Sequence, residues 1–218
     1  MRKSYDVILF DLDGTLTDPG MGITNSVAYA MRHYGLAVPP RSELYKYIGP
    51  PLVGSFEKWC GFSREKAVEA VEVYREYFSD KGIFENERYE GIPELLKKLK
   101  SAGKRLIIAT SKPTEFTVRI LEHFGLAEYF EFVAGANMGE TRTRKSEVIE
   151  YAFSECGITD RSSAIMVGDR EHDVNGAHEA GIECIGVLYG YGSRAELVNA
   201  GADALAESVS ELEKLLIG

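Results

Sequence analysis

Short apolar runs alternate with amphipathic segments along most of the chain. Five runs are nearly continuous in apolar residues, which is typical of β-strands buried on both faces. They are Tyr5–Phe10, Lys104–Ala109, Glu131–Ala134, Ala164–Val167 and Glu183–Leu188. The segments between them have helical spacing and predict helices at Gly91–Ala102, Pro113–Phe124, Lys145–Cys156, Ser193–Ala200 and Ser208–Leu216. Strands that alternate with helices predict an α/β fold with a doubly wound parallel sheet.

One long stretch interrupts this alternation. Between Thr17 and Arg88 no apolar run has the character of a strand, and three amphipathic segments predict helices instead. These helices are expected at Ile23–Tyr34, Pro51–Cys60 and Ser63–Asp80. A helical block directly after the first strand of an α/β chain indicates an inserted cap domain. We therefore expect a core domain of residues 1–16 and 89–218 and a helical cap domain of residues 17–88.

Composition and charge narrow the classes of function. The chain has 218 residues, of which 44% are hydrophobic, so it can fill a substantial core. Its net charge of −9 repels polyanions, so we expect no nucleic-acid polymer as a partner. No apolar run is long enough to cross a membrane, and three scattered cysteines favour neither a disulfide framework nor a zinc site. We expect a cytoplasmic protein, and the sequence is compatible with either a monomer or a homodimer.

Carboxylates follow two of the predicted strands. Asp11 and Asp13 come directly after the first strand, and Asp169 and Asp173 follow the strand at Ala164–Val167. Ligands of open α/β sheets bind beyond the carboxyl ends of strands, and carboxylates gathered there repel one another unless a cation lies between them. Oxygen ligands of this kind suit Mg²⁺ better than zinc. Helix capping is the alternative interpretation of Asp169 and Asp173.

Groups suited to binding an anion follow the second predicted strand. Thr110, Ser111 and Lys112 precede a helix, and hydroxyls and backbone amides at a helix N-terminus can bind an anion. Their alternative interpretation is an ordinary helix cap. Lys145 begins a further predicted helix, where its charge opposes the helix dipole. A lysine at this unfavourable position indicates a functional role for its charge. Arg142 or Arg144 could serve in its place.

Taken in order, these segments resemble the haloacid dehalogenase (HAD) superfamily of phosphatases over essentially the whole chain. The sequence Asp11-Leu12-Asp13-Gly14-Thr15-Leu16 resembles the first motif of that superfamily, Thr110 the second, Lys145 the third, and Gly168-Asp169 with Asp173 the fourth. Within the superfamily the chain resembles the phosphoglycolate-phosphatase group. Residues 142–145, 168–173 and 186–192 further resemble bacterial members described as 5′-nucleotidase-like. The chain departs from many members at Ser146, where they have proline.

The resemblance implies a Rossmann-like core and a Mg²⁺-dependent phosphomonoester hydrolase that acts on a small phosphorylated metabolite, as phosphoglycolate phosphatases do. It implies Asp11 as the nucleophile that becomes an aspartyl phosphate and Asp13 as the general acid and base. Thr110 and Lys145 would bind the phosphoryl group. The metal would be held by Asp11, the backbone carbonyl of Asp13 and Asp169, while Asp173 orients Lys145 or a metal-bound water. Contacts to the substrate or its phosphate are expected from Gly14, Thr15, Ser111, Lys112 and Gly49.

Several other functions share parts of this pattern. A 5′-nucleotidase acting on nucleoside monophosphates is the first alternative, and a sugar-phosphate mutase is the second. Mutases of this type carry a histidine where this chain has Ile23, and a haloacid dehalogenase would not need Asp13. The spacing GxGxxA at residues 190–195 fits either a dinucleotide-binding loop or a turn that forms the site floor. A receiver-like signalling domain would lack the helical insertion.

In the cap, we expect the Gly- and Pro-rich segment Ile48–Gly54 to influence substrate choice.

Overall fold

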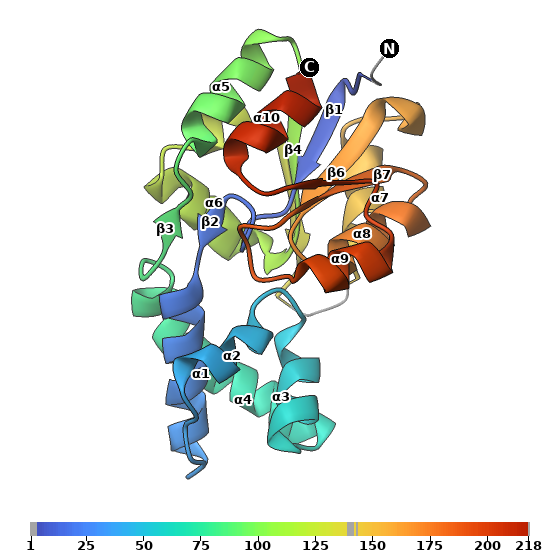
Figure 1. Cartoon of the computed structure of the whole chain (residues 1–218). Coiled ribbons are helices and arrows are strands. Elements are labelled where there is room, and N and C mark those ends of the chain that lie inside the picture. Colours follow the sequence, from blue (N-terminus) through green and yellow to red (C-terminus); the bar gives the residue numbers. More distant parts are fainter. Residues whose placement is uncertain (1–3, 139–141, 143, 218) are drawn as a thin grey trace. The chain divides into compact units, whose positions relative to one another are not determined.

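The computed structural model describes residues 4–138, 142 and 144–217 (Figure 1). The chain forms two compact units, one of Met1–Thr17 with Arg88–Gly218 and one of Asp18–Glu87. Each junction lies one residue from the one expected from the sequence. Residues 1–3 and 218 of the expected core range lie outside the described residues, as do Thr141 and Thr143 next to Arg142. Below, the unit that contains both termini is called the core unit, and Asp18–Glu87 is called the inserted unit.

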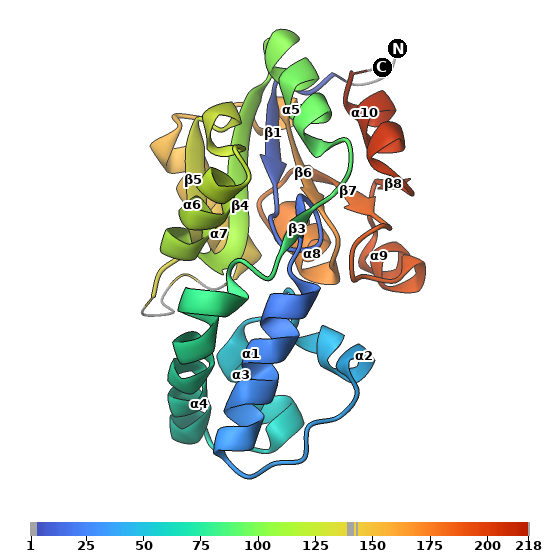
Figure 2. The ribbon, with the colours of Figure 1, turned by 90° about the vertical axis from the view of Figure 1, so that its left-hand side faces the viewer.

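Six parallel strands form the sheet of the core unit, in the order β5-β4-β1-β6-β7-β8 (Figure 2). Their bounds are β1 Val7–Phe10, β4 Arg105–Pro113, β5 Phe132–Ala136, β6 Ala164–Gly168, β7 Glu183–Val187 and β8 Ala204–Ala206. From β1 the chain builds outward through β4 to β5, and it then returns to place β6 on the other side of β1. The strand order therefore reverses between β1 and β6, which is where sheets of this type bind ligands.

Helices cover both faces of this sheet, which is why its strands are apolar on both sides. On one face, alternate residues such as Leu9, Ile107 and Met166 pack against α7 (Lys145–Glu155) and α8 (Glu171–Glu179). The opposite face is covered by α5 (Ile92–Ser101) and α10 (Val209–Ile217), which lie against each other (Figures 1 and 2). The remaining bounds are α6 Thr114–His123 and α9 Arg194–Ala200.

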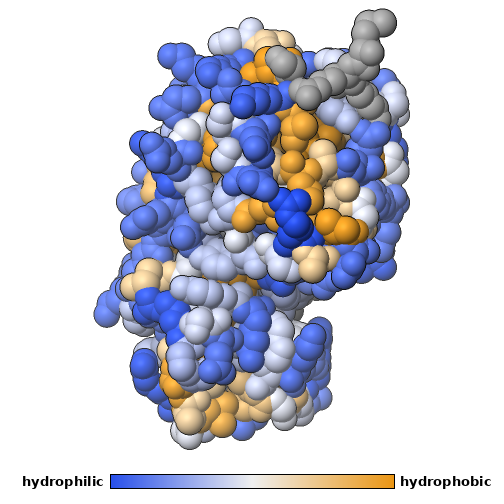
Figure 3. All heavy atoms as spheres, in the orientation of Figure 1, coloured by the Kyte–Doolittle hydropathy of each residue, from blue (hydrophilic) through white to orange (hydrophobic). Residues whose placement is uncertain are grey.

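The α/β class and the doubly wound parallel sheet predicted from the sequence are confirmed. All five predicted strands are present, and β4 continues past its apolar run through Thr110 to Pro113. The sixth strand, β8, was not predicted because its three residues, Ala-Leu-Ala, form too short an apolar run. In the described part of the chain no helix is long and apolar enough to span a bilayer. Hydrophilic side chains occupy much of the visible surface of the core unit (Figure 3).

The inserted unit is helical, with α1 at Gly20–His33, α2 at Arg41–Leu44, α3 at Leu52–Cys60 and α4 at Arg64–Tyr77. A π-helical turn at Phe78–Gly82 follows α4. Ser63 caps α4, because its Oγ accepts a hydrogen bond of 3.3 Å from the Lys66 amide. The fully buried Phe56 packs against Tyr47, so it serves the core of this unit. The chain enters and leaves through two short paired strands, β2 (Thr17–Asp18) and β3 (Glu87–Arg88).

Candidate active site

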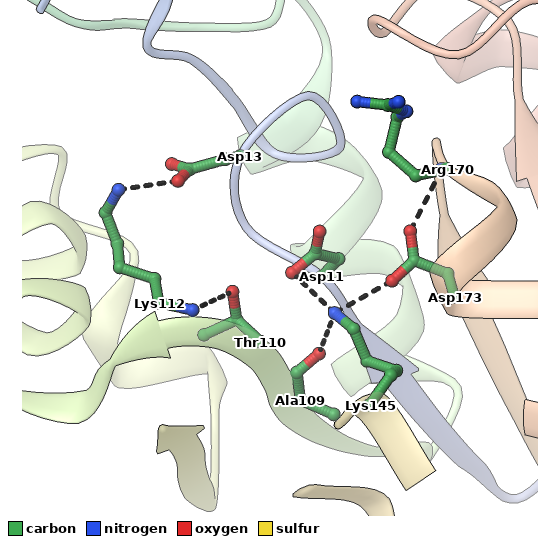
Figure 4. A network of polar contacts seen from close by, with 8 residues as sticks. All are labelled: Asp11, Asp13, Ala109, Thr110, Lys112, Lys145, Arg170 and Asp173. Carbon is green, nitrogen blue, oxygen red and sulfur yellow. Dashed lines mark hydrogen bonds and ion pairs between the residues drawn. The ribbon is translucent and has the colours of Figure 1, made fainter. Parts of the chain in front are cut away.

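The predicted chemical groups of the core unit meet at the carboxyl ends of its three central strands (Figure 4). Asp11 directly follows β1, Asp169 directly follows β6, and Thr110 lies within the last part of β4. The Asp11 amide donates a hydrogen bond of 2.9 Å to the carbonyl oxygen of Val167, so the end of β1 is held against β6. Adjacent strands thus bring together residues that are far apart in the sequence.

Lys145 lies at the centre of this group. Its Nζ is 2.9 Å from Asp11 Oδ1 and 2.8 Å from Asp173 Oδ1, and it donates a hydrogen bond of 2.9 Å to the carbonyl oxygen of Ala109. Burial alone would lower the pKa of Lys145, but the two carboxylates outweigh it and raise the pKa above its ordinary value. Lys145 is therefore a fixed cation between two buried carboxylates.

Three buried carboxylates form an acidic cluster around this lysine. One oxygen from each of Asp11, Asp169 and Asp173 lies within 4.8 Å of the others. Burial raises the pKa of Asp169 well above its usual range, and the charges of Asp173 and Asp11 raise it further. With all three carboxylates ionised, the cluster would therefore hold more negative charge than Lys145 can balance.

The donor set of this cluster fits a divalent cation. Asp169 Oδ2 accepts a hydrogen bond of 2.7 Å from the Tyr191 amide, while Asp169 Oδ1 is buried without a hydrogen-bond partner among the described residues. Three carboxylates beside one ammonium leave an excess of two negative charges when all are ionised. Oxygen-only ligands with this excess are what Mg²⁺ prefers in proteins. The residues present thus suit a magnesium ion.

Asp13 lies apart from the acidic cluster and faces Lys112 (Figure 4). The distance from Asp13 Oδ2 to Lys112 Nζ is 2.5 Å, and both side chains are nearly buried. Burial raises the pKa of the Asp13 carboxyl, and Lys112 partly opposes this shift. The third carboxylate of the acidic cluster, beside those of Asp11 and Asp169, belongs to Asp173 and not to Asp13. A contribution of the Asp13 backbone carbonyl to metal binding stays a prediction.

Glycines pack directly against Asp169. Gly14 has a φ of +82°, and a Cβ there would lie 2.2 Å from Asp169 Oδ2. A Cβ at Gly190 would lie 2.5 Å from Asp169 Cβ, and one at Gly192 would lie 1.8 Å from the Asp169 carbonyl oxygen. Any larger residue would displace Asp169. Of the two interpretations of the GxGxxA spacing, these contacts favour the turn that forms the site floor.

The remaining predicted residues differ in their surroundings. Thr110 is buried, and its Oγ1 accepts a hydrogen bond of 3.2 Å from the Lys112 amide. Thr15 Oγ1 is buried without a hydrogen-bond partner in the described part of the chain, and Ser111 is half-buried next to Thr110. Gly49 lies in the inserted unit with a φ of +100°, and its contact with a substrate stays a prediction.

The sequence offers three basic residues, Lys145, Arg142 and Arg144, for binding the phosphoryl group. Of these, Lys145 is the one whose side chain contacts Asp11. Arg142 donates two hydrogen bonds, of 3.1 and 2.9 Å, to the Gly135 carbonyl oxygen and stacks on the Tyr151 ring. Arg144 is exposed and pairs with Glu179 at 3.1 Å. The sequence did not indicate the Tyr191 amide or the Ala109 carbonyl as site groups, because backbone atoms carry no residue-type signal.

Comparisons with known proteins show the family to which the chain belongs. The sequence model of the haloacid dehalogenase-like hydrolases matches residues 8–187. A 5′-nucleotidase of Pseudomonas aeruginosa is 45% identical over 193 residues, which are 88% of this chain and 87% of that protein. The tyrosine-protein kinase PtkA of Mycobacterium tuberculosis is 37% identical over 214 residues, covering 98% of this chain and 72% of the kinase.

A solved structure is also very similar. The crystal structure of a predicted phosphatase from Clostridium acetobutylicum superposes with a TM-score of 0.95, at 48% identity and over 97% of each chain. Among more distant relatives, a protein of Vibrio parahaemolyticus named phosphoglycolate phosphatase is 27% identical over 97% of this chain and 96% of its own length.

Proposed function

This chain belongs to the haloacid dehalogenase-like hydrolase family, and we propose that it is a Mg²⁺-dependent phosphatase that works through an aspartyl phosphate on Asp11. Family membership and the phosphatases among its relatives support hydrolysis of phosphorylated substrates. The observation that carries the proposal is the buried cluster of Asp11, Asp169 and Asp173 around Lys145. Such a concentration of buried negative charge is costly to the fold unless a further cation balances it.

Asp11 is the proposed nucleophile. One of its carboxylate oxygens would attack phosphorus, forming a new P–O bond while the bond from phosphorus to the leaving oxygen breaks. The ion pair of 2.9 Å with Lys145 fixes the orientation of this carboxylate, and the ammonium also offers positive charge to a phosphoryl oxygen. Thr110, buried beside it on β4, would donate its hydroxyl to another phosphoryl oxygen.

Asp13 is the proposed general acid and base. It would donate a proton to the leaving oxygen and later accept one from the water that hydrolyses the aspartyl phosphate. Burial favours the protonated form that the first step requires, since it raises the pKa of this carboxyl. Lys112, 2.5 Å away, favours the ionised form that the second step requires. The two opposing influences suit a group that must exchange a proton in both directions.

The metal would be held by side-chain oxygens of Asp11 and Asp169, with Asp173 beside them and, as a prediction, by the Asp13 backbone carbonyl. When bound, Mg²⁺ would supply positive charge that lowers the repulsion between the phosphate and Asp11. The Tyr191 amide, which donates 2.7 Å to Asp169 Oδ2, leaves the second oxygen of that carboxylate available as a ligand. Asp173, paired with Lys145 at 2.8 Å, keeps that lysine in place.

The proposed substrate is a small phosphorylated metabolite, with phosphoglycolate as the first candidate. A nucleoside monophosphate is the second candidate, and the 45% identity to a named 5′-nucleotidase favours it. A sugar-phosphate mutase is less well supported, because Ile23 is buried and apolar where such an enzyme would need a histidine. We propose water as the phosphoryl acceptor.

The inserted unit is proposed to act as the cap that selects the substrate. Its Ile48–Gly54 segment combines two prolines with the positive φ of Gly49, which gives the backbone a defined shape. Replacing side chains in this segment should change the preference between phosphoglycolate and a nucleotide by about tenfold or more. The rate on a chromogenic aryl phosphate should change much less. An equal loss on all three substrates would argue against a role in selection.

The test of the proposed function is phosphate release from a panel of phosphoglycolate, 5′-nucleotides, sugar phosphates and an aryl phosphate. Each substrate is assayed with Mg²⁺, with EDTA, and with the Asp11→Asn variant to exclude a contaminating phosphatase. We expect release that requires Mg²⁺ and is lost in the variant, and the best substrate decides between the candidates. Full activity in EDTA would disprove the metal, and full activity of Asp11→Asn would disprove the nucleophile.

A further inference from the structure

A glutamate outside the predicted motifs binds the turn that carries two carboxylates of the acidic cluster, Asp169 and Asp173. Glu196 lies in α9, and its Oε1 accepts hydrogen bonds of 2.8 Å from Arg170 Nε and 3.0 Å from the Glu171 amide. The ion pair is mostly shielded from water, with side-chain exposures of 15% for Arg170 and 20% for Glu196. A pair this shielded is harder for solvent to replace than an ordinary surface pair.

The two residues that Glu196 binds, Arg170 and Glu171, lie between Asp169 and Asp173 in the sequence. Arg170 follows Asp169 directly, and its amide donates a hydrogen bond of 3.0 Å to Asp173 Oδ2. Glu171 is the first residue of α8, so its amide has no partner within that helix. Glu196 supplies the missing acceptor from a different helix. The start of α8, and with it the position of Asp173, is therefore tied to α9.

The residues just before α9 hold Asp169 from a second direction. The Tyr191 amide donates to Asp169 Oδ2, and Gly192 packs against the Asp169 carbonyl. Ser193 then caps α9, because its Oγ accepts a hydrogen bond of 3.1 Å from the Glu196 amide. One continuous segment, residues 191–196, thus contacts the side chain of Asp169, its carbonyl, and the two residues that follow it.

We propose that Glu196 is a positioning residue for the metal site, which holds the turn between β6 and α8 so that Asp169 and Asp173 keep the spacing a divalent cation requires. Glu196 touches neither carboxylate and acts through Arg170 and the start of α8. This inference rests on the metal site proposed above. Loss of a partner that orients metal ligands typically lowers metal affinity about 10- to 100-fold, and we expect a loss at the lower end of that range.

The test is a Mn²⁺ titration of the metal-free protein followed by electron paramagnetic resonance, with Mg²⁺ as competitor. Glu196→Gln keeps the size of the side chain but removes its charge, and should weaken metal binding about tenfold. Glu196→Asp restores the charge and should recover part of the affinity. Phosphatase activity of Glu196→Gln should recover as Mg²⁺ is raised, because the defect lies in metal affinity.

The matched control is Glu207→Gln. Glu207 forms an ion pair of 2.6 Å with Arg194, which is also in α9, but this pair is exposed and does not contact the turn. Metal affinity of the Glu207→Gln variant should equal that of the wild type. If Glu196→Gln fails to fold, as judged by circular dichroism, Arg170→Gln breaks the same ion pair from the other side and should show the same loss.

The outcomes separate the two proposals. If the wild type binds no metal, the metal site of the proposed function fails and this inference fails with it. If the wild type binds metal and a folded Glu196→Gln or Arg170→Gln variant binds it equally well, the positioning role is overturned while the proposed function stands. If both variants weaken binding but Glu207→Gln does so equally, the effect is not specific to the turn, and the positioning role is again overturned.

Discussion

The two units differ in whether their buried polar side chains have hydrogen-bond partners. In the inserted unit, the buried hydroxyls of Thr24, Ser26 and Ser55 donate to carbonyl oxygens one helical turn earlier, at 2.5, 2.6 and 3.0 Å. In the core unit, buried oxygens without a hydrogen-bond partner among the described residues gather after β1 and β6. They belong to Asp13, Thr15, Thr17 and Asp169, whereas Asn86 is the one such residue found in the described inserted unit. The buried Oδ1 oxygens of Asp11 and Asp173 at the same place have the Lys145 ammonium as their partner.

This difference separates polar groups that support the fold from polar groups that the proposed ligands would contact. A buried polar group left without a partner costs about 1–3 kcal/mol, so a fold rarely keeps several of them in one place. Lys145 forms ion pairs with Asp11 and Asp173 and offsets part of this cost. The rest remains concentrated at one edge of the sheet, where a metal ion and a phosphate would supply the missing interactions.

The largest expected effect follows from removing the proposed nucleophile. Asp11→Asn should lower turnover at least about a thousandfold, because no other group in the cluster is placed to form the phosphoryl bond. The fold should persist, since the change removes one of three crowded negative charges. Phosphate release and thermal unfolding, measured on the same preparation, check both halves. Residual activity above about 0.1 per cent would contradict the role of Asp11.

A second prediction concerns the cation that holds the cluster together. Lys145→Met keeps the length of the side chain but leaves Asp11 and Asp173 buried without their ion-pair partner. The free energy of unfolding of the metal-free protein should fall by about 3 kcal/mol at pH 7. Urea denaturation in EDTA measures this change.

The matched control for that prediction is Lys98→Met in the same unit. Lys98 pairs with Glu213 at 2.7 Å, but its side chain is 56% exposed. This substitution should change the free energy of unfolding by less than about 0.5 kcal/mol. Similar losses in the two variants would show that the cluster has no special dependence on Lys145.

A third prediction tests the contrast between satisfied and unsatisfied hydroxyls by its sign. Ser26→Ala removes a buried hydrogen bond of 2.6 Å from the inserted unit and should cost about 1 kcal/mol of stability. Thr15→Val removes a buried hydroxyl that lacks a partner and should be neutral or stabilising by less than about 1 kcal/mol. Thr15→Val should nevertheless raise the KM for phosphate esters. Equal destabilisation by both substitutions would contradict the distinction.

The smallest expected effect concerns pH. Burial raises the pKa of Glu196, but the Glu171 amide and Arg170 outweigh it and lower the pKa below its ordinary value. A lowered pKa means that Glu196 stabilises the fold above the unfolded-state pKa, near 4.3, and loses this contribution as pH falls through the folded-state pKa. In EDTA, wild type should exceed Glu196→Gln by less than about 1 kcal/mol at pH 7. The difference should shrink as the pH falls below the unfolded-state pKa, and a difference that grows on acidification would contradict this assignment.

The sequence predicted the parts of the site that depend on local pattern. Nearly continuous apolar runs marked β1 and β6, and the position of Asp11 and Asp169 after these runs was enough to place both at one edge of a parallel sheet. The helix that begins at Lys145 was also predicted, and the structure places that lysine, and not Arg142 or Arg144, beside Asp11. The catalytic roles themselves remain predictions.

Features that depend on contacts between distant segments could not be predicted. The pairing of Lys112 with Asp13 joins residues 99 positions apart, and the contact of Glu196 with Arg170 joins residues 26 apart. Neither leaves a periodic pattern in the chain. β8 was missed because its run Ala-Leu-Ala is too short to predict a strand, and its pairing with the edge of β7 is likewise a contact between separate segments.

The pairing of β2 with β3 has a consequence for how such enzymes diversify. Because the chain leaves the core unit after residue 17 and returns to it at residue 88 through two adjacent strands, the intervening 18–87 segment is a cassette joined at neighbouring points. Insertions with closely spaced ends can be lengthened, shortened or exchanged without moving the host sheet. Evolution can therefore replace the whole cassette between lineages while the chemistry at the ends of β1, β4 and β6 is inherited unchanged.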